Sequence, residues 1–353
     1  MEHDPHQRPP WCAPRSPVND NNVVPQRLSQ VCRPRRVAAG HRRLRRLRPT
    51  CPCDRRSRGA CPVASSTPEP AASVVIPAYQ EGRVIGRCLE GLARAGTPPL
   101  DVVVAANGCT DDTVVVARRY AGVTVLDLSR PGKAGALNAG DAAARTFPRI
   151  FLDADITLSP DALGGMISAL SVSDARVAAP HVRFRTEHCS WAVRAYYDVY
   201  RELPYVRSGL VGLGVYGLSE AGRRRFSDFP ALEADDLFVQ RLFTAEERVV
   251  TDGWFDVHAP RDLRNLVAVR TRVARGNAAL ARAGDDDVVG GSAGDFSTST
   301  TATLRSLFLL VLRRPRLLPG AVVYVGVVLA GRRAARAAAS TPSTAWDRDE
   351  STR

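Results

Sequence analysis

The stretch RIFLDADI, residues 149–156, is an apolar run that ends in two aspartates separated by one alanine. Charged side chains are rarely buried within a strand, so the two acids are expected just past a strand over 149–152, where open α/β sheets place ligands. Residues two apart in an extended chain point to the same side, which would let Asp153 and Asp155 face one ligand. Two carboxylates so placed suit a divalent cation or a row of hydroxyl groups. The alternative is a solvated turn at the end of the strand.

Strand and helix patterns alternate four times around this stretch. The alternation predicts an α/β fold, a doubly wound and mostly parallel sheet with flanking helices and a ligand crevice at the carboxyl ends of its strands. The apolar runs that predict strands cover 73–77, 101–106, 123–128 and 149–152, and the helical patterns between them cover 82–96, 111–121 and 133–146.

Polar residues follow three of these four predicted strands. Tyr79 and Glu81 follow the first strand, Asn107 follows the second, and Asp153 and Asp155 follow the fourth. Because the carboxyl ends of parallel strands meet at one edge of a sheet, these side chains are expected to converge there. Solvation alone explains such convergence poorly, so we predict a binding site at this edge.

The basic charge of the chain is concentrated near its two ends. The 353 residues have a formal net charge of +13 and are 44% apolar, which is typical of a globular protein with a large core. Residues 1–72 hold 14 arginines and 5 acids, residues 304–353 hold 9 arginines and 3 acids, and 73–303 is left at about −2. An enzyme that acts on nucleic acid is expected to carry its basic charge on the folded domain, so we predict no nucleic-acid partner.

Composition divides the chain into five parts. Five of the eight cysteines lie among the clustered Arg and Pro of the first part, without zinc-knuckle spacing or the apolar segment of a secretory signal. We expect a disordered leader there, an upstream start codon being an alternative origin. The five expected parts are the basic leader over 1–72, a folded domain over 73–284, a linker over 285–303, a membrane-associated helical tail over 304–338 and a polar C-terminus over 339–353.

Two apolar segments in the tail, 307–312 and 317–330, are separated by a cluster of arginines. Fourteen helical residues span about 21 Å, less than the roughly 30 Å of bilayer hydrocarbon, and Pro319 and Gly320 interrupt the second segment. The pattern therefore predicts an interfacial pair of segments with arginines at anionic headgroups. This places the protein in the cytoplasm, peripheral on the inner face of the plasma membrane. A helical pair packed back on the domain is the alternative.

Seven motifs follow one another in order along the folded domain, from residue 74 to residue 277. They are VVIPAYQEGRVIGRCL (74–89), VVVAANGCTDDT (102–113), PGKAGALNAG (131–140), FLDADI (151–156), GVYGLSEAGRRRF (214–226), EADDLFVQRLF (233–243) and VRTRVARGN (269–277). Together they are similar to the nucleotide-diphospho-sugar domain of the family-2 glycosyltransferases, which have the GT-A fold. The resemblance implies inverting transfer of a sugar from a nucleotide-diphospho-sugar donor, assisted by Mg²⁺ or Mn²⁺.

The chemistry of such a transfer assigns roles to five residues. Breaking a sugar–diphosphate bond requires the charge on the departing diphosphate to be neutralised, which a divalent ion held by Asp155 would do. By resemblance, Asp153 shares the metal site or contacts a donor hydroxyl, and Asp236 is the catalytic base with Asp235 as its partner. Lys133 can reach a phosphate from the start of a helix. An ordinary surface lysine is the alternative, although Lys133 is the only lysine in the chain.

Further donor contacts are expected from Pro77, Tyr79, Glu81 and Asn107 at the ends of the first two strands. Relatives usually carry two acidic residues after the second strand, where this chain has Ala106 and Asn107. Asn107 can exchange hydrogen bonds with a base but cannot ligate as a carboxylate does. The identity of the nucleotide therefore stays open.

Arg272 and Arg275 lie three apart on a predicted helix over 261–284 and resemble an arginine pair that suits a diphosphate. Two solvated helix arginines are the alternative. Gly276 stands where processive polysaccharide synthases have tryptophan, so a polymerase is not predicted.

The stretch 212–217 matches the GxGxxG pattern of a dinucleotide-binding turn. Its position is wrong for that role, because it follows four strand–helix units instead of the first strand. A flexible loop on the acceptor side of the sugar is expected there.

The sequence thus predicts an inverting glycosyltransferase that acts on a hydroxyl acceptor, with lipid-linked and cell-envelope acceptors as candidates. The absent acidic pair leaves open a non-catalytic nucleotide-sugar-binding protein. A nucleotidyltransferase of similar fold is a second alternative, although its glycine-rich first loop with a basic residue is missing.

Overall fold

The computed structural model describes residues 69–95, 99–207, 214–231, 235–283 and 300–337. The expected leader (1–72) and linker (285–303) lie outside these residues except for 69–72 and 300–303, and the expected polar C-terminus (339–353) lies outside them entirely. The first strand begins at Ala72 and the tail helix at Thr300, ahead of the expected starts at 73 and 304.

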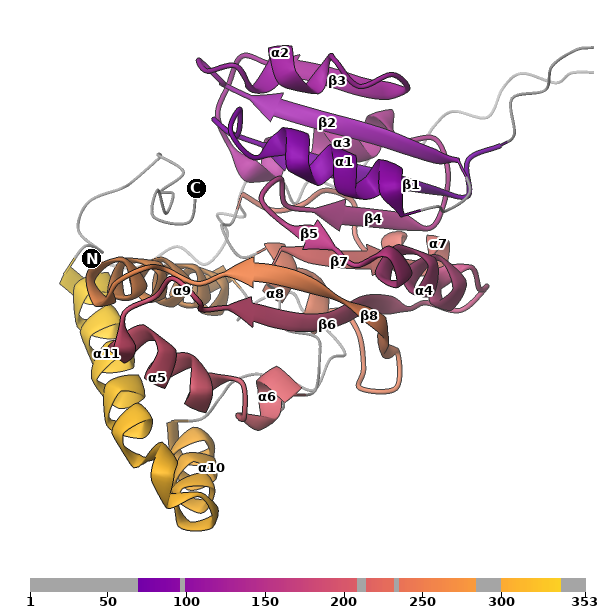
Figure 1. The fold of residues 1–353 in the computed structure, drawn as a ribbon. Coiled ribbons are helices and arrows are strands. Elements are labelled where there is room, and N and C mark those ends of the chain that lie inside the picture. Colours follow the sequence, from indigo (N-terminus) through magenta and orange to yellow (C-terminus); the bar gives the residue numbers. More distant parts are fainter. Residues whose placement is uncertain (1–68, 96–98, 208–213, 232–234, 284–299, 338–353) are drawn as a thin grey trace, which may run out of the picture. The chain divides into compact units, whose positions relative to one another are not determined.

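The described residues form one eight-stranded sheet with the strand order β3-β2-β1-β4-β7-β6-β8-β5 (Figure 1). Strands β3, β2, β1 and β4 are parallel, β7 is antiparallel to β4 and β6, β8 is parallel to β6, and β5 is antiparallel to β8. Six strands therefore run in one direction, which confirms the predicted mostly parallel sheet. The strands are β1 (Ala72–Ala78), β2 (Leu100–Asn107), β3 (Val123–Leu128), β4 (Arg149–Leu152), β5 (Thr157–Leu158), β6 (Val177–Arg185), β7 (Val215–Leu218) and β8 (Arg248–His258).

Helices cover both faces of the first four strands, as in the GT-A-like winding that the sequence predicts. Alternate residues of β1 pack on opposite faces: Val74 lies in one core cluster with Ile85, and Val75 lies in a second cluster with Leu137. The helices of this half are α1 (Ile85–Arg94), α2 (Thr113–Ala117) and α3 (Lys133–Ala143).

A glycine lets α3 approach the sheet closely. A Cβ built on Gly140 would lie 2.5 Å from Val75 Cγ1 on β1, a distance that real Cβ atoms do not reach. Only glycine fits this contact, so the C-terminal half of α3 lies close against β1.

The second half of the domain surrounds the remaining strands with shorter helices and one long helix. α5 and α9 follow the carboxyl ends of β6 and β8, so both begin at the same edge as the predicted site. The helices are α4 (Pro160–Leu170), α5 (Trp191–Tyr200), α6 (Pro204–Arg207), α7 (Glu220–Arg223), α8 (Asp235–Arg241) and α9 (Leu263–Ala283).

The tail consists of α10 (Thr300–Arg313), a 3₁₀ turn (Pro315–Leu317) and α11 (Leu318–Ala337). The expected interruption at Pro319 and Gly320 is wrong, because both lie in the first turn of α11, where proline costs no hydrogen bond. Among the described residues, the stretch Pro315–Ala337 is long and apolar enough to cross a membrane by length and composition.

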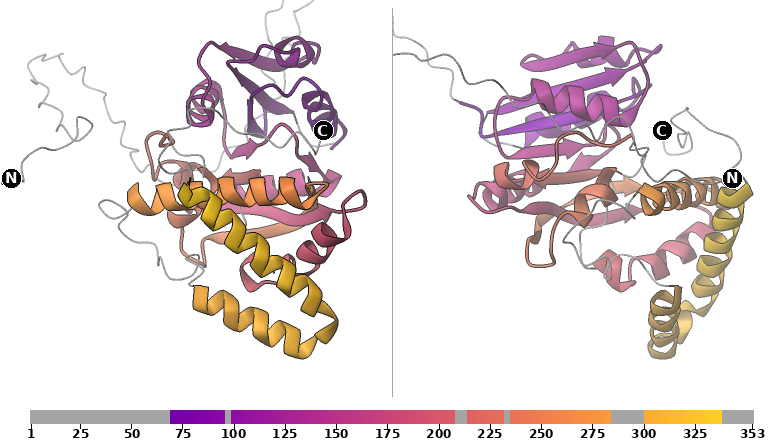
Figure 2. Two further views of the ribbon diagram at one scale, coloured as in Figure 1. Left: turned by 90° about the vertical axis from the view of Figure 1, so that its left-hand side faces the viewer. Right: turned by 180° about the vertical axis from the view of Figure 1, so that it is seen from behind.

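One face of α11 packs on the domain, as Figures 1 and 2 show for its course along α5 and α9. Gly320 lies so close to the Ala195 carbonyl of α5 that a side chain would not fit. Tyr324 is buried and stacks on Tyr196 of α5 with ring centroids 5.3 Å apart. This face of α11 is therefore packed on the domain, as in the alternative to an interfacial tail that the sequence left open.

Candidate active site

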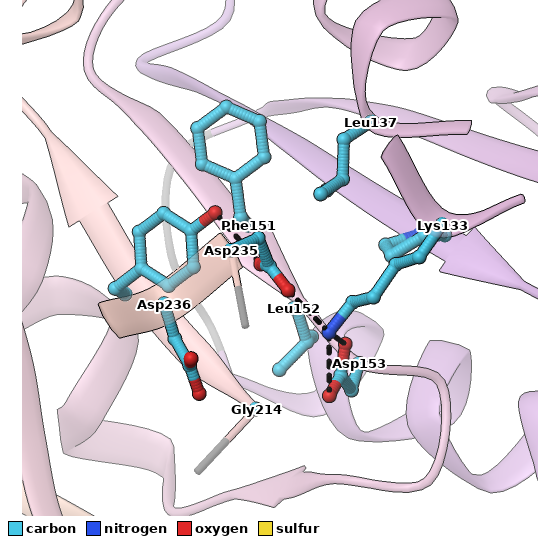
Figure 3. A pocket seen from close by; sticks show the side chains of 10 residues that line it. Lys133, Leu137, Phe151, Leu152, Asp153, Gly214, Asp235 and Asp236 are labelled. Carbon is cyan, nitrogen blue, oxygen red and sulfur yellow. Dashed lines mark hydrogen bonds and ion pairs between the residues drawn. The ribbon is translucent and has the colours of Figure 1, made fainter. Parts of the chain in front are cut away.

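A small cavity opens at the carboxyl edge of the sheet, where β1 and β4 end and the antiparallel β7 begins (Figure 3). The starts of α3 and α8 close it from two sides. Its polar lining is a cluster of one lysine, one tyrosine and three aspartates. The residues that line it are Pro77, Lys133, Leu137, Phe151, Leu152, Asp153, Gly214, Tyr216, Asp235 and Asp236.

Lys133 is at the centre of this cluster. Its Nζ lies 3.0 Å from Asp153 Oδ1 and 2.9 Å from Asp235 Oδ1, and its side chain is 18% exposed. Burial alone would lower the pKa of the Lys133 ammonium, but the two carboxylates outweigh it and raise the pKa above its usual value. The only lysine of the chain is therefore a fixed positive charge in the cavity, not a surface residue.

Asp153 faces the cavity and Asp155 does not line it. Residues 153–156 form a turn, closed by the Ile156 N–H donating to the Asp153 carbonyl at 3.1 Å, so the expectation from an extended chain is wrong here. Asp155 acts electrostatically on Asp153, on Cys88 of α1 and on His258 at the end of β8. Burial raises the pKa of Asp153 to about 6, although Lys133 opposes the rise.

The acids of the EADDLF motif open α8. Asp235 is buried, pairs with Lys133 and accepts a hydrogen bond of 3.1 Å from the Tyr216 hydroxyl. Asp236 lines the cavity beside it, and its Oδ1 accepts the Leu237 N–H at 2.6 Å. Burial, reinforced by the charge of Asp235, raises the pKa of Asp236 to about 7. Glu233 of the same motif lies outside the described residues.

Asn107 is fully buried and uses both ends of its amide within the protein. Its Nδ2 donates to the Ala78 carbonyl at 2.8 Å, and its Oδ1 accepts the Gly132 N–H at 2.8 Å. These contacts join the end of β1 to the turn that precedes Lys133. Asn107 therefore holds the position of Lys133, and this arrangement does not turn its amide toward a base as the sequence suggested.

Asn107→Asp is expected to lower the free energy of unfolding by about 1–3 kcal/mol, because a carboxylate cannot donate to the Ala78 carbonyl and would be buried against it. Chemical denaturation of the variant and the wild type measures this difference. Unchanged stability would show that the two hydrogen bonds do not hold the loop. The exposed Asn277, on α9, offers a control substitution of the same kind.

Side-chain contacts also fix the loops that follow β1 and β2. The Gln80 Oε1 accepts the N–H groups of Thr110 and Asp111 at 2.7 and 3.1 Å. The Glu81 N–H donates to Thr113 Oγ1 at 2.7 Å, and the Glu81 residue is buried. These two loops are therefore joined into one rigid rim beside the cavity.

The other residues predicted to contact the nucleotide-sugar donor do not all line this cavity. Pro77 lines the cavity, and Tyr79 lies half-buried just beyond β1. Arg272 and Arg275 lie on α9 and are not among the residues that line the cavity.

Sequence reasoning missed Gly214 and Tyr216. Within 212–217, the residues from 215 on form β7, so the expectation of a loop is wrong for them, and the strand's place beside β4 excludes a dinucleotide-binding turn. The Gly214 carbonyl accepts the Asp153 N–H at 2.7 Å, and a Cβ on Gly214 would lie 3.1 Å from Asp153 Oδ2. Gly214 is there because this strand begins against the aspartate, whereas a Cβ on Gly217 would lie 2.5 Å from Leu170 of α4.

Comparison with known proteins gives one family and several partial relatives. Residues 73–227 match the family model described as Glycosyl transferase family 2. The 4,4'-diaponeurosporenoate glycosyltransferase of Staphylococcus aureus (strain MRSA252) is 37% identical over 105 residues, 28% of each chain. This chain therefore matches less than a third of the length of that relative.

Two solved structures match more of the chain at lower sequence identity. Glucosyl-3-phosphoglycerate synthase from Mycobacterium tuberculosis, in complex with Mn²⁺, UDP and glucosyl-3-phosphoglycerate, is 22% identical, with a TM-score of 0.43 over 61% of this chain and 81% of that one. TarS from S. aureus, in complex with UDP, is 14% identical, with a TM-score of 0.39 over 79% and 94%.

The motifs that line the cavity lie in the matched residues, except those of α8. β1 through β7 and the helices among them form the winding that these motifs predict. Over residues 73–227, the chain is therefore similar to the proteins of glycosyl transferase family 2.

Proposed function

We propose that this protein transfers a sugar from a nucleotide-diphospho-sugar to a hydroxyl acceptor, with inversion at the anomeric carbon. The observation that carries this proposal is the buried cluster at the carboxyl edge, in which Lys133 is paired with Asp153 and Asp235 and its charge also acts on Asp236. Lys133, a cation that can bind a phosphate, and Asp236, a carboxylate with a raised pKa, therefore line the same cavity.

The donor diphosphate would be held at the start of α3. Lys133 supplies a positive charge there, and the first backbone N–H groups of the helix add their partial charge. Lys133 is held between two carboxylates when no donor is bound, so a diphosphate would compete with Asp153 for the ammonium. This competition would leave Asp153 free to contact the sugar or a metal ion.

Asp155 and Asp153 are the residues that would hold Mg²⁺ or Mn²⁺. Among the described residues, no three His, Cys, Asp or Glu side chains converge closely enough to hold a metal alone. Such a donor set still fits, because Mg²⁺ is commonly bound by one or two carboxylates together with substrate phosphates. When bound, the ion would neutralise the charge that builds on the departing diphosphate.

Asp236 would act as the base. In the transfer, the acceptor oxygen bonds to the anomeric carbon, the bond from that carbon to the diphosphate oxygen breaks, and the hydroxyl proton passes to Asp236. With a pKa of about 7, Asp236 is substantially deprotonated at neutral pH and still basic enough to take this proton. Asp235 would act as its partner, because its charge raises the pKa of Asp236 and its other contacts hold it in place.

The S. aureus relative is a glycosyltransferase that acts on 4,4'-diaponeurosporenoate, which supports transfer to an acceptor over a role in binding alone. For this chain we propose a hydroxyl acceptor carried on a lipid or in the cell envelope.

The test of the metal site is Asp155→Ala. We expect the variant to release nucleoside diphosphate from the donor at least about 10-fold more slowly than the wild type, and to bind Mn²⁺ more weakly in the presence of nucleoside diphosphate. Asp161→Ala, which removes an exposed acid on α4, is the matched control and should behave as the wild type. Equal activity of Asp155→Ala and wild type, with both insensitive to chelator, would contradict the metal assignment.

A further inference from the structure

Large apolar side chains are exposed along both helices of the tail. Phe308 and Leu312 on α10 are each 67% exposed, and Val322 on α11 is 66% exposed. Single exposed apolar residues are common on protein surfaces, but a series of them on adjoining helices marks an interaction surface. We name this series the tail face; it consists of Leu304, Phe308, Leu312, Leu318, Val322 and Leu329.

The spacing of these residues gives α11 two distinct sides. At 3.6 residues per turn, Leu318, Val322 and Leu329 fall within about 40° of arc on one side of the helix. The buried residues Tyr324 and Val327 point to the opposite side, into the core shared with α5 and α9. On α10, the three tail-face residues follow one another at intervals of four, which also places them along one stripe.

The charge of the tail is entirely of one sign. Residues 300–337 contain seven arginines and no acidic residue. Arg314 forms an ion pair with the domain, its Nη1 lying 2.8 Å from Glu202 Oε1. Arg333 and Arg336 are exposed and lie on the same side of α11 as Leu318 and Val322. Apolar side chains flanked by arginines match the layering of hydrocarbon and anionic headgroups in a bilayer leaflet.

Close contacts hold α11 to the catalytic domain. Besides the contact of Gly320 with α5, a Cβ on Gly331 would lie 3.1 Å from the Arg270 backbone of α9. Crossing a bilayer would require α11 to leave both helices, which would expose the aromatic cluster around Tyr196 and Tyr324. It would also take the arginines at its C-terminal end through the hydrocarbon. In Figure 2 (left), α10 and α11 lie in front of the domain, with no other described helix or strand over them.

We propose that the tail face docks on an anionic membrane surface, with α11 lying along the surface and not spanning it. α11 is held by α5 and α9, both of which begin at the carboxyl edge of the sheet. Docking therefore sets the orientation of the catalytic edge relative to the membrane. The inference rests on the tail alone and holds whether or not the proposed sugar transfer is correct.

The test uses the purified full-length chain and vesicles of phosphatidylglycerol mixed with phosphatidylcholine, compared with vesicles of phosphatidylcholine alone. The double variant Phe308→Glu/Val322→Glu places two carboxylates in the tail face at positions that are already exposed, so its melting temperature should match that of the wild type. Val115→Glu is the matched control, because Val115 is 53% exposed on α2, away from the tail.

We expect the wild type and Val115→Glu to co-sediment with the anionic vesicles, to release in high salt, and to be extracted by an alkaline carbonate wash. The double variant should bind at least about 10-fold more weakly. Equal binding of the double variant and the wild type would overturn the proposal, and so would retention of the wild type after the carbonate wash, which indicates a spanning helix. Self-association without lipid that the double variant abolishes would also overturn it, because the tail face would then bind a second copy of the chain.

Discussion

Asp236→Asn is expected to lower turnover by about 100-fold or more while leaving donor affinity and melting temperature nearly unchanged. Asparagine has the same shape as aspartate and keeps an oxygen for the Leu237 N–H that Asp236 accepts. It cannot accept the proton of the acceptor hydroxyl. If Asp236 only complemented the dipole at the N-terminus of α8, it would contribute about 0.3–1 kcal/mol of stability. Losing that contribution is far too small an effect to explain a loss of turnover of about 100-fold.

The pH dependence of the wild type gives an independent check of this role. A base works only when deprotonated, so turnover should rise with pH along a limb centred near the Asp236 pKa of about 7, and Asp236→Asn should lack that limb. Near-wild-type turnover in Asp236→Asn together with loss in Asp235→Asn would move the base to Asp235. If neither substitution affects turnover, the motif serves only to begin the helix.

Lys133→Met is expected to destabilise the protein by about 3–5 kcal/mol at neutral pH, the range measured when one partner of a buried ion pair is removed. The substitution leaves Asp153 and Asp235 without their counter-charge, and the Asp235 side chain is only 4% exposed. The deficit should shrink as the pH falls toward 6, because Asp153, whose pKa is about 6 even beside Lys133, becomes neutral.

Denaturant unfolding of Lys133→Met and the wild type at several pH values measures this effect, and donor binding in the same variant should be lost. Arg130→Met removes an exposed cation three residues earlier and serves as the control. A stability loss below about 1 kcal/mol, or a deficit that does not change with pH, would contradict the buried ion pairs.

The first half of the fold follows from local patterns in the sequence. The alternation of apolar runs and helical spacing gave β1 to β4 and the helices between them, because each of these elements is decided by its own residues and by its neighbours along the chain. The order of β7, β6, β8 and β5 was not predictable in this way. Their pairing joins residues far apart in sequence, and short strands such as β5 have too little periodicity to be recognised.

The site was only partly predictable for a similar reason. Residue type and motif order singled out Lys133, Asp153, Asp235 and Asp236, which the fold gathers in one cavity. The directions of side chains depended on local backbone that the pattern did not reveal. The turn after β4 separates Asp155 from the cavity, and Asn107 points into the protein. Tyr216 was hidden inside a glycine pattern that suggested a different role.

In the tail, too, composition predicted the helical segments but not how they pack. Composition correctly identified two apolar, arginine-flanked helical segments. It could not show which side of α11 packs on the domain, because Gly320 and Tyr324 contact α5, more than one hundred residues earlier in the chain.

The most direct test of the proposed function is mass spectrometry of the products formed by the wild type and Asp236→Asn from a panel of nucleotide-diphospho-sugars, with Mn²⁺ and a cell lipid extract. We expect the wild type to release nucleoside diphosphate and to add one sugar residue to an acceptor in the extract, and Asp236→Asn to bind the same donor with little product. Release of pyrophosphate by the wild type would indicate nucleotidyl transfer. Tight donor binding without any product across the panel would indicate a binding protein, and either result would contradict sugar transfer at this site.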